Sequence, residues 1–138
     1  MTSDLLLIGN VASQAGVSVD TVRHYERKGI LSNVVRDGSG YRRYPAETVD
    51  RIRMVRQALA IGFTLDELAR IFRQRASGNP PCTYVRDLAN RKLAELDERI
   101  AAMNAVRAAL SETAMSWDKR LQSTPEGGFA YLLETLIH

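Results

Sequence analysis

The 138-residue sequence predicts a mainly α-helical fold in which a helix-turn-helix and a β-hairpin wing precede a long helix and a short C-terminal helix. Three observations predict it. Over most of the chain, apolar residues recur every three or four positions, which is the spacing of one helix face. Residues 31–44 are instead rich in β-branched, aromatic and turn-forming residues. From Pro81 to about Met115 nothing interrupts the helical pattern.

The helix-turn-helix is predicted from two short amphipathic segments separated by a tight turn. The apolar face of the first helix is formed by Ile8, Val11, Ala12 and Ala15. Gly16 is suited to stop this helix. Ser18 is a good N-cap for the second helix, Asp20 favours its positive end, and Gly29 follows its last turn.

The wing is predicted over residues 31–44. It opens on the β-branched Val34 and Val35, turns at Asp37-Gly-Ser-Gly40 and resumes with Tyr41-Arg-Arg-Tyr44. The two glycines of the turn allow the backbone to reverse tightly.

Two further helices are expected after the wing. The third runs from about Pro45 to Ile61, with proline in its first turn, and its apolar stripe contains Val49, Ile52, Val55 and Leu59. The fourth opens on the capping box Thr64-Leu-Asp-Glu67. Its buried side is expected to contain Leu65, Leu68, Ile71 and Phe72.

A long helix follows a linker at residues 76–81 and continues to about Met115. Some 34 residues at 1.5 Å each span roughly 50 Å, which is too long to bury an apolar stripe within a chain of this size. That stripe is formed by Leu93, Leu96, Ile100, Met103, Leu110 and Ala114. Its spacing favours an antiparallel coiled coil with a second copy of the chain, hence a homodimer. The alternative is an intramolecular hairpin with the N-terminal half. The apolar spacing of residues 129–137 predicts a short amphipathic helix that follows a turn at residues 125–128.

Composition and charge narrow the functional classes. No apolar run approaches the roughly 18 residues that span a bilayer, and no signal peptide is recognisable, so we expect a cytoplasmic protein with no membrane association. A single cysteine, Cys82, fits a reducing compartment. The first 76 residues hold 12 Lys or Arg against 8 Asp or Glu, and the remainder 7 against 8. The basic half is therefore where a polyanion would bind. No catalytic constellation or phosphate-binding glycine loop is present, so we do not expect an enzyme.

The second helix and the wing carry the residues suited to duplex DNA. In a helix-turn-helix the second helix enters the major groove, so Thr21 and Arg23 can project toward bases or phosphates, and the Tyr25 hydroxyl toward a phosphate. In the wing, aromatic rings interleaved with arginines suit the DNA backbone. The alternatives are a solvated charged helix face and, for Tyr44, a place in the core.

The sequence resembles the MerR family of regulators over residues 7 to about 76, and more loosely to about Met115. The similarity is carried by Ile8-Gly-Asn-Val-Ala12, by Ala15–Leu31, by Gly40-Tyr-Arg-Arg-Tyr44 and by Ile61–Leu68. His24 stands where the family more often has Tyr or Phe, and Pro45 where a Ser or Thr cap is usual.

The resemblance implies a dimer that binds a pseudo-palindrome in promoter DNA and, on binding an effector, bends and untwists it to realign the promoter for RNA polymerase. It implies activation of transcription. The residues that match the family's DNA contacts are Thr21, Arg23, Tyr25, Tyr41, Arg42 and Arg43, with Arg36 and Arg53 as further candidates. The expected domains are a winged helix-turn-helix DNA-binding domain at 7–76, a dimerisation helix at 81–115, and an effector-region loop with a short helix at 116–138.

The effector is not specified by the sequence. In metal-sensing relatives a cysteine at the position of Cys82 pairs with cysteines after the dimer helix, but residues 115–126 contain neither Cys nor His. A soft-metal site needs two to four thiolate or imidazole ligands. Cys82 is therefore a structural cysteine, a thiol-redox sensor at a helix start, which favours the thiolate, or a metal ligand completed by other groups. Trp117, Phe129 and Tyr131 form an apolar effector pocket or simply pack the tail. A protein-interaction module without specific DNA binding is the alternative from another class.

Overall fold

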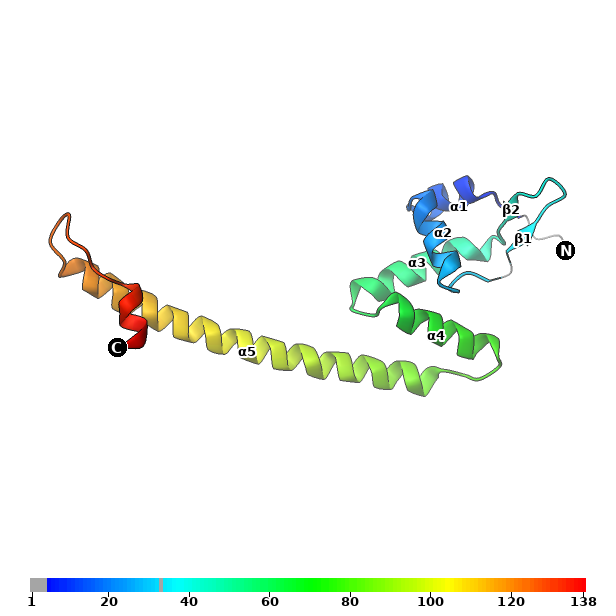
Figure 1. The fold of residues 1–138 in the computed structure, drawn as a ribbon. Coiled ribbons are helices and arrows are strands. Elements are labelled where there is room, and N and C mark those ends of the chain that lie inside the picture. The colour runs from blue at the N-terminus through cyan, green and yellow to red at the C-terminus, as the bar shows by residue number, and fades with distance from the viewer. Residues whose placement is uncertain (1–4, 33) are drawn as a thin grey trace. The chain divides into compact units, whose positions relative to one another are not determined.

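The computed structural model describes residues 5–32 and 34–138 (Figure 1). It is mainly helical and carries a two-stranded wing, which confirms the predicted fold class. The elements are α1 (Ile8–Ala15), α2 (Val19–Arg27), β1 (Val35–Arg36), β2 (Arg42–Arg43), α3 (Glu47–Ala60), α4 (Leu65–Ala76), α5 (Cys82–Gln122) and the 3-10 helix η1 (Leu133–Ile137). The chain forms two compact units, which meet after Asn90 within α5.

The helix ends of the first unit follow the expected local rules. Gly16 ends α1 with φ 72°, the left-handed conformation that glycine adopts without strain. The Ser18 Oγ accepts a 3.0 Å hydrogen bond from the Thr21 backbone N–H and so caps α2. At α4 the predicted capping box is complete, since the Thr64 and Glu67 side chains each accept from the other residue's backbone N–H.

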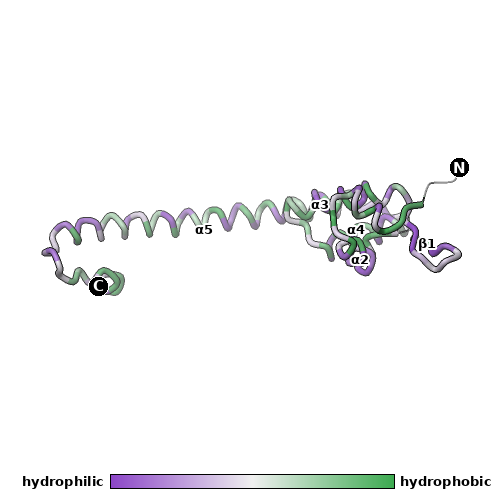
Figure 2. The backbone as a smooth tube through the Cα atoms, turned by 90° about the horizontal axis from the view of Figure 1, so that it is seen from above, coloured by the Kyte–Doolittle hydropathy of each residue, from purple (hydrophilic) through white to green (hydrophobic). Residues whose placement is uncertain are grey.

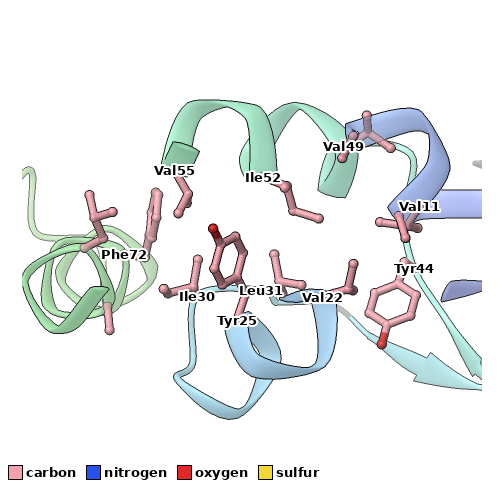
Figure 3. Close-up of a cluster of buried hydrophobic side chains, with 14 of the residues drawn as sticks. Val11, Val22, Tyr25, Ile30, Leu31, Tyr44, Val49, Ile52, Val55 and Phe72 are labelled. Atoms are coloured by element: carbon pink, nitrogen blue, oxygen red, sulfur yellow. The ribbon is translucent and has the colours of Figure 1, made fainter. Parts of the chain in front are cut away.

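The core of this unit lies between α1, α2, α3 and α4. Figure 3 shows α3 directing Ile52 and Val55 toward side chains of α2 and of the loop that follows it. The largest side chains that are fully buried are Val11, Val22, Ile30, Tyr44, Ile52 and Val55. Val11, Val22, Ile52 and Val55 lie on the apolar faces that the sequence spacing predicts.

The wing is an antiparallel pair in which Val35 faces Arg43 and Arg36 faces Arg42. Its second strand continues into Tyr44, which pairs with Leu6 through two backbone hydrogen bonds of 2.7 and 2.8 Å. This bridge fixes the base of the wing to the segment just before α1, so the wing is not a free hairpin.

Some expected boundaries differ from the structure. The third helix begins at Glu47 instead of Pro45, since Pro45 and Ala46 form the turn before it. The long helix continues to Gln122 instead of ending near Met115, because no residue before Pro125 breaks it. The expected C-terminal amphipathic helix is a shorter 3-10 segment, η1.

The second unit contains the rest of α5 and the C-terminal tail. The tail is held by a 2.8 Å hydrogen bond from Trp117 Nε1 to Thr135 Oγ1 and by a bond from Arg120 Nε to the Ala130 carbonyl. Hydrophobic and hydrophilic residues alternate along α5 (Figure 2). The predicted stripe is exposed in the single chain, with Met103 exposed by 71%.

No helix in the described ranges is both long enough and apolar enough to cross a membrane.

Candidate nucleic-acid interface

The outer face of α2 presents Thr21 and Arg23, while Val22 points into the core. The hydroxyls of Ser18 and Thr21 lie 2.9 Å apart. Arg23 Nη1 forms a 3.5 Å ion pair with Asp20, and both side chains are largely exposed. Both candidate contacts are therefore accessible at the N-terminal end of the helix, as expected for a recognition helix.

The prediction for Tyr25 needs correction. Its side chain is only 5% exposed and rises from α2 toward α3 among the core residues (Figure 3). Burial raises its pKa, with the charge of Arg56 acting in the opposite direction. Val22 and Tyr25 are three positions apart, so they share the buried face, and the Tyr25 ring packs in the core instead of meeting a phosphate.

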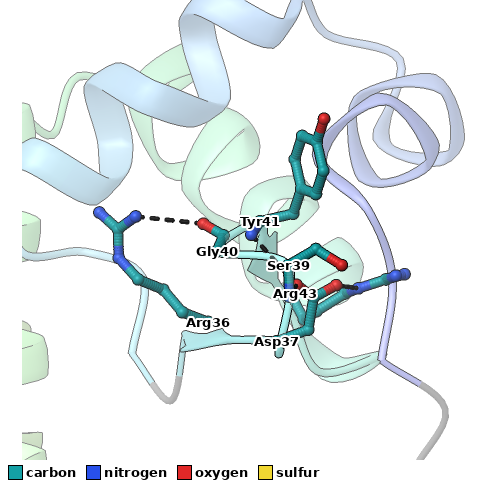
Figure 4. Close-up of polar contacts among 6 residues, drawn as sticks. All are labelled: Arg36, Asp37, Ser39, Gly40, Tyr41 and Arg43. Atoms are coloured by element: carbon teal, nitrogen blue, oxygen red, sulfur yellow. Dashed lines mark hydrogen bonds and ion pairs between the residues drawn. The ribbon is translucent and has the colours of Figure 1, made fainter.

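The wing is organised by one carboxylate, that of Asp37 (Figure 4). Its Oδ1 accepts hydrogen bonds from the backbone N–H groups of Ser39 (2.9 Å) and Tyr41 (3.1 Å). Its Oδ2 accepts from Arg43 Nε at 2.8 Å. The bond from Arg43 is the largest cause that holds the pKa of Asp37 below its ordinary value; burial opposes it, and the two backbone bonds add to it. Asp37 thus fixes both the turn and the arginine that follows it.

A second ion pair connects the wing to α2. Arg42 Nη1 lies 3.0 Å from Glu26 Oε1, and Tyr44 Oη donates to the same carboxylate oxygen at 3.4 Å. Tyr44 is fully buried, so of the two alternatives for this residue the core position is confirmed. The structure therefore brings the wing and α2, distant in sequence, together through Glu26.

The remaining wing candidates are accessible. Arg36 Nη1 donates to the Gly40 carbonyl at 3.2 Å, and Tyr41 is an exposed aromatic side chain. An exposed ion pair such as Arg23–Asp20 contributes only about 0–1 kcal/mol. A DNA phosphate can therefore compete for the Arg23 guanidinium without a large loss of protein stability, whereas the Glu26 partner of Arg42 is only 16% exposed.

Arg53, a further candidate, lies on α3 and connects it to α1. Its Nη2 donates to the Gln14 carbonyl at 2.9 Å, and its Nη1 pairs with Asp50 at 3.4 Å. Arg56 acts in the same way, since its Nη1 donates to the carbonyls of Ala15 and Gly16 at 3.4 and 3.3 Å. Both arginines satisfy carbonyl groups at the end of α1 that the helix leaves unpaired.

Cys82 is the first residue of α5 and is exposed. It lies in a cleft of about 580 Å³ whose other lining residues include Arg75, Pro80, Val85 and Arg86. Two guanidinium groups repel a cation, and none of these neighbours is a thiolate, imidazole or carboxylate. Among the residues that the structure describes, no three His, Cys, Asp or Glu side chains gather as a metal site would require. Within the single chain, the residues that line the Cys82 cleft do not supply the two to four thiolate or imidazole ligands of a soft-metal centre.

The candidate effector residues at the C-terminus, Trp117, Phe129 and Tyr131, differ in burial and in surroundings. Trp117 is partly buried against Thr135 beside a shallow cleft of about 350 Å³. The rings of Phe129 and Tyr131 lie 5.9 Å apart, and Phe129 is 83% exposed. Within the single chain the three aromatic side chains do not line one common pocket.

Two residues important to this surface were not anticipated, Glu26 and Asp37. Asp at the start of a Gly-Ser-Gly turn was an available signal, because its carboxylate commonly binds backbone N–H groups two residues later. The pairing of Glu26 with Arg42 depends on a contact across 16 positions that no local pattern contains.

Comparison with known proteins assigns the winged helix-turn-helix and most of α5 to one family. The model of the MerR HTH family regulatory protein matches residues 6–75, and the model described as "MerR, DNA binding" matches residues 49–113. A mercuric resistance operon regulatory protein of Pseudomonas fluorescens is 38% identical over 107 residues, 78% of this chain and 73% of that protein. The HTH-type transcriptional regulator CueR of Yersinia pestis is 32% identical over 106 residues, 75% of this chain and 74% of that protein.

Solved structures of transcription regulators of this family are similar in fold to this chain. The lead(II) complex of the transcription regulator PbrR691 from Ralstonia metallidurans CH34 is similar with a TM-score of 0.70 and 26% identity, covering 80% of this chain and 87% of that one. The mercury(II) complex of MerR from Bacillus megaterium MB1 has a TM-score of 0.60 and 25% identity, covering 96% of this chain and all of that one.

Proposed function

Because the chain belongs to the MerR family of DNA-binding transcription regulators, we propose that it acts as an effector-responsive dimer that distorts promoter DNA to control initiation by RNA polymerase. One observation carries the proposal for this chain: α2 and the wing, joined by Arg42 and Glu26, present accessible guanidinium groups on two neighbouring elements. Two such surfaces in a dimer would grip one duplex at separated points, which is the arrangement that bending requires.

The proposed DNA contacts are the accessible members of the predicted set. They are Thr21, Arg23, Arg36, Tyr41, Arg42 and Arg43, with Arg53 as a further candidate. In the wing, Asp37 binds only the Nε of Arg43, and the two terminal nitrogens of Arg43 make no hydrogen bond within the described residues. The wing thus orients this arginine while leaving donors for a phosphate.

The dimer is proposed from the exposed stripe of α5. Leu93, Leu96 and Ile100 are each about half exposed in the single chain and keep the spacing of a coiled-coil seam. A second, antiparallel copy would cover the stripe. Analytical ultracentrifugation tests this: the parent chain should sediment as a dimer, and a Leu96→Asp, Ile100→Asp variant as a monomer. A monomeric parent would contradict the proposal.

DNA binding is tested by fluorescence anisotropy with the promoter duplex upstream of the chain's own gene, titrated over a range of salt concentrations. About four arginine–phosphate contacts per protomer predict a slope of log K against log salt of about −7 for a dimer. Arg43→Ala should reduce this slope by about 1.8 and weaken binding. Arg70→Ala is the matched control, since Arg70 is exposed on α4 and stacks over Tyr84 at 4.9 Å instead of lying in the proposed interface.

Two outcomes would contradict the site. In one, Arg23→Ala and Arg43→Ala variants bind as tightly as the parent. In the other, Arg70→Ala weakens binding as much as they do. Distortion is a separate measurement: energy transfer between dyes at the duplex ends should rise when the dimer binds, and an unchanged signal would argue against bending.

For the effector, we infer that the chain does not use a cysteine-cluster metal centre, although relatives are named for mercuric resistance. Cys82 is the chain's single cysteine, and Arg75 and Arg86 lie in its cleft. Metal analysis of the protein purified from cells should find no stoichiometric soft metal. A metal that is present in the parent and lost in Cys82→Ser would overturn the inference and support the metal-sensing alternative.

The Cys82→Ser variant also tests the alternative that Cys82 is a thiol-redox sensor. If peroxide changes promoter binding by the parent but not by Cys82→Ser, Cys82 is a redox sensor. If both proteins respond alike, Cys82 has no sensing role, and the aromatic tail around Trp117 becomes the leading effector region. Quenching or shift of the fluorescence of Trp117, the chain's single tryptophan, then reports ligand binding directly.

A further inference from the structure

A cleft of about 370 Å³ lies in the first unit where the loop after α2 meets α3 and α4. Its lining includes Gly29, Ser32, Arg51, Phe72, Arg73 and Arg75. The volume falls within the roughly 300–1,000 Å³ range of small-molecule sites. Among the described residues that line it, the polar groups are the exposed backbone of Gly29, the Ser32 hydroxyl and three guanidiniums.

Arg51 is held in a defined orientation. Its Nη1 donates to the Ile30 carbonyl at 3.2 Å and to Ser32 Oγ at 3.4 Å. Its guanidinium carbon lies 4.3 Å from the centre of the Phe72 ring. The side chain is therefore preorganised, and ordering it would cost a ligand little.

Arg75 brings a second positive charge to the same ring, since its guanidinium carbon lies 5.4 Å from the centre of Phe72. Burial and, next, the charge of Arg75 lower the pKa of Arg51. Within the described residues, no carboxylate lies within ion-pair distance of Arg51, Arg73 or Arg75, whereas Arg23, Arg42, Arg43 and Arg53 each have one. Like charges are thus gathered around the cleft without a protein anion to balance them.

We propose that this cleft binds the phosphate or carboxylate group of a small anionic molecule between Arg51, Arg73 and Arg75. Guanidinium groups present parallel N–H donors that match the paired oxygens of either group. The Phe72 ring offers an apolar wall to the rest of such a molecule. The three arginines are not among the residues proposed for DNA contact, although Arg75 also lines the cleft that contains Cys82.

Occupancy would act on the recognition helix. Gly29 and Ser32 follow directly after α2, and Arg51 already connects that loop to α3. An anion that also binds Arg73 and Arg75 of α4 connects all three helices and stabilises the position of the C-terminal end of α2.

Inorganic phosphate is the probe, titrated into the full-length protein at constant ionic strength set with chloride. Arginine Nε–Hε NMR signals and calorimetry should show saturable binding in the millimolar range. Arg75→Gln should weaken it about tenfold, since one charge-assisted hydrogen-bond partner is lost. Arg70→Gln, on the same helix but outside the cleft, should leave it unchanged. Acetate titrated in the same way shows whether the cleft prefers a carboxylate or a phosphate.

Three outcomes overturn the proposal. The first is that phosphate produces only the linear, unsaturated response of a general salt effect. The second is that Arg70→Gln weakens binding as much as Arg75→Gln. The third is that promoter duplex displaces the phosphate and Arg75→Gln weakens duplex binding, which would assign the cleft to the DNA backbone. Arg73→Gln provides a second cleft variant if Arg75→Gln unfolds, as judged by circular dichroism.

Discussion

Tyr44 connects three parts of the first unit, and two substitutions separate what its ring does from what its hydroxyl does. The ring is fully buried, the backbone pairs with Leu6, and the hydroxyl donates to Glu26 at 3.4 Å. Burial, followed by the negative charge of Glu26, raises the pKa of the hydroxyl. Tyr44→Ala removes the ring, whereas Tyr44→Phe removes only the hydroxyl.

The expected losses of stability differ severalfold. Replacing a buried aromatic side chain by alanine lowers the free energy of unfolding by about 3–5 kcal/mol, which is the loss expected for Tyr44→Ala. The hydroxyl bond is long, and Glu26 keeps its 3.0 Å ion pair with Arg42, so no charge is left unpaired. Tyr44→Phe should therefore cost about 1 kcal/mol or less. At roughly 4–8 °C per kcal/mol for a domain of this size, Tyr44→Phe lowers Tm by a few degrees and Tyr44→Ala by about 12–40 °C.

Thermal unfolding followed by circular dichroism measures both losses. Protein concentration is held constant, because the Tm of a dimer depends on it. Promoter binding by Tyr44→Phe should equal that of the parent, since a core hydroxyl does not reach DNA. Equal losses of stability in the two variants would refute the argument that the ring carries the stabilisation. A more than tenfold loss of DNA affinity in a stable Tyr44→Phe variant would refute the assignment of Tyr44 to the core.

Three further predictions concern local structure in the first unit. The pKa of Asp37 is lower in the folded state than in the unfolded state, so its contribution to wing stability is fully present above the unfolded value near 4 and is lost as pH falls through the lower folded value. A carboxyl NMR titration should place its midpoint below about 3.9. A midpoint at or above that value would contradict the wing geometry. Gly16→Ala places a side chain at φ 72°, so it should lower the free energy of unfolding by about 1–2 kcal/mol in urea titrations. The cost comes from the backbone conformation, because the new Cβ would meet only Arg56 Nη1, at 3.6 Å. An unchanged free energy of unfolding would show that the turn relaxes. Thr64→Ala removes one half of the capping box and should cost about 1 kcal/mol, with Thr64→Ser as the control that restores it.

Local signals predicted most of the secondary structure because each acts over a few residues. Ser18, Gly16 and the Thr64–Glu67 box end or begin helices through contacts within four positions, and all appear as the sequence indicates. The apolar spacing on α3 likewise predicts that Ile52 and Val55 are buried. The end of α5 lies beyond the predicted Met115, at Gln122, because no residue between the two breaks a helix.

The candidate interface was less predictable for a physical reason. An arginine's partner depends on which elements the fold brings within a few ångströms. Arg42 with Glu26, and Arg53 with the Gln14 carbonyl, are separated by 16 and 39 positions, so no local pattern contains them. Tyr25 is the opposite case: its spacing of three from Val22 indicates a buried face, and the structure buries its ring there.

The two guanidinium contacts from α3 to the end of α1 have a mechanical consequence. Arg53 and Arg56 hold the carbonyls of Gln14, Ala15 and Gly16, which lie at the bend between α1 and α2. A glycine bend would otherwise be the most compliant point of the helix pair. These two contacts brace the bend by joining it to α3. If the dimer bends DNA as proposed, a load on α2 would pass through them into α3, and the bend itself would not yield.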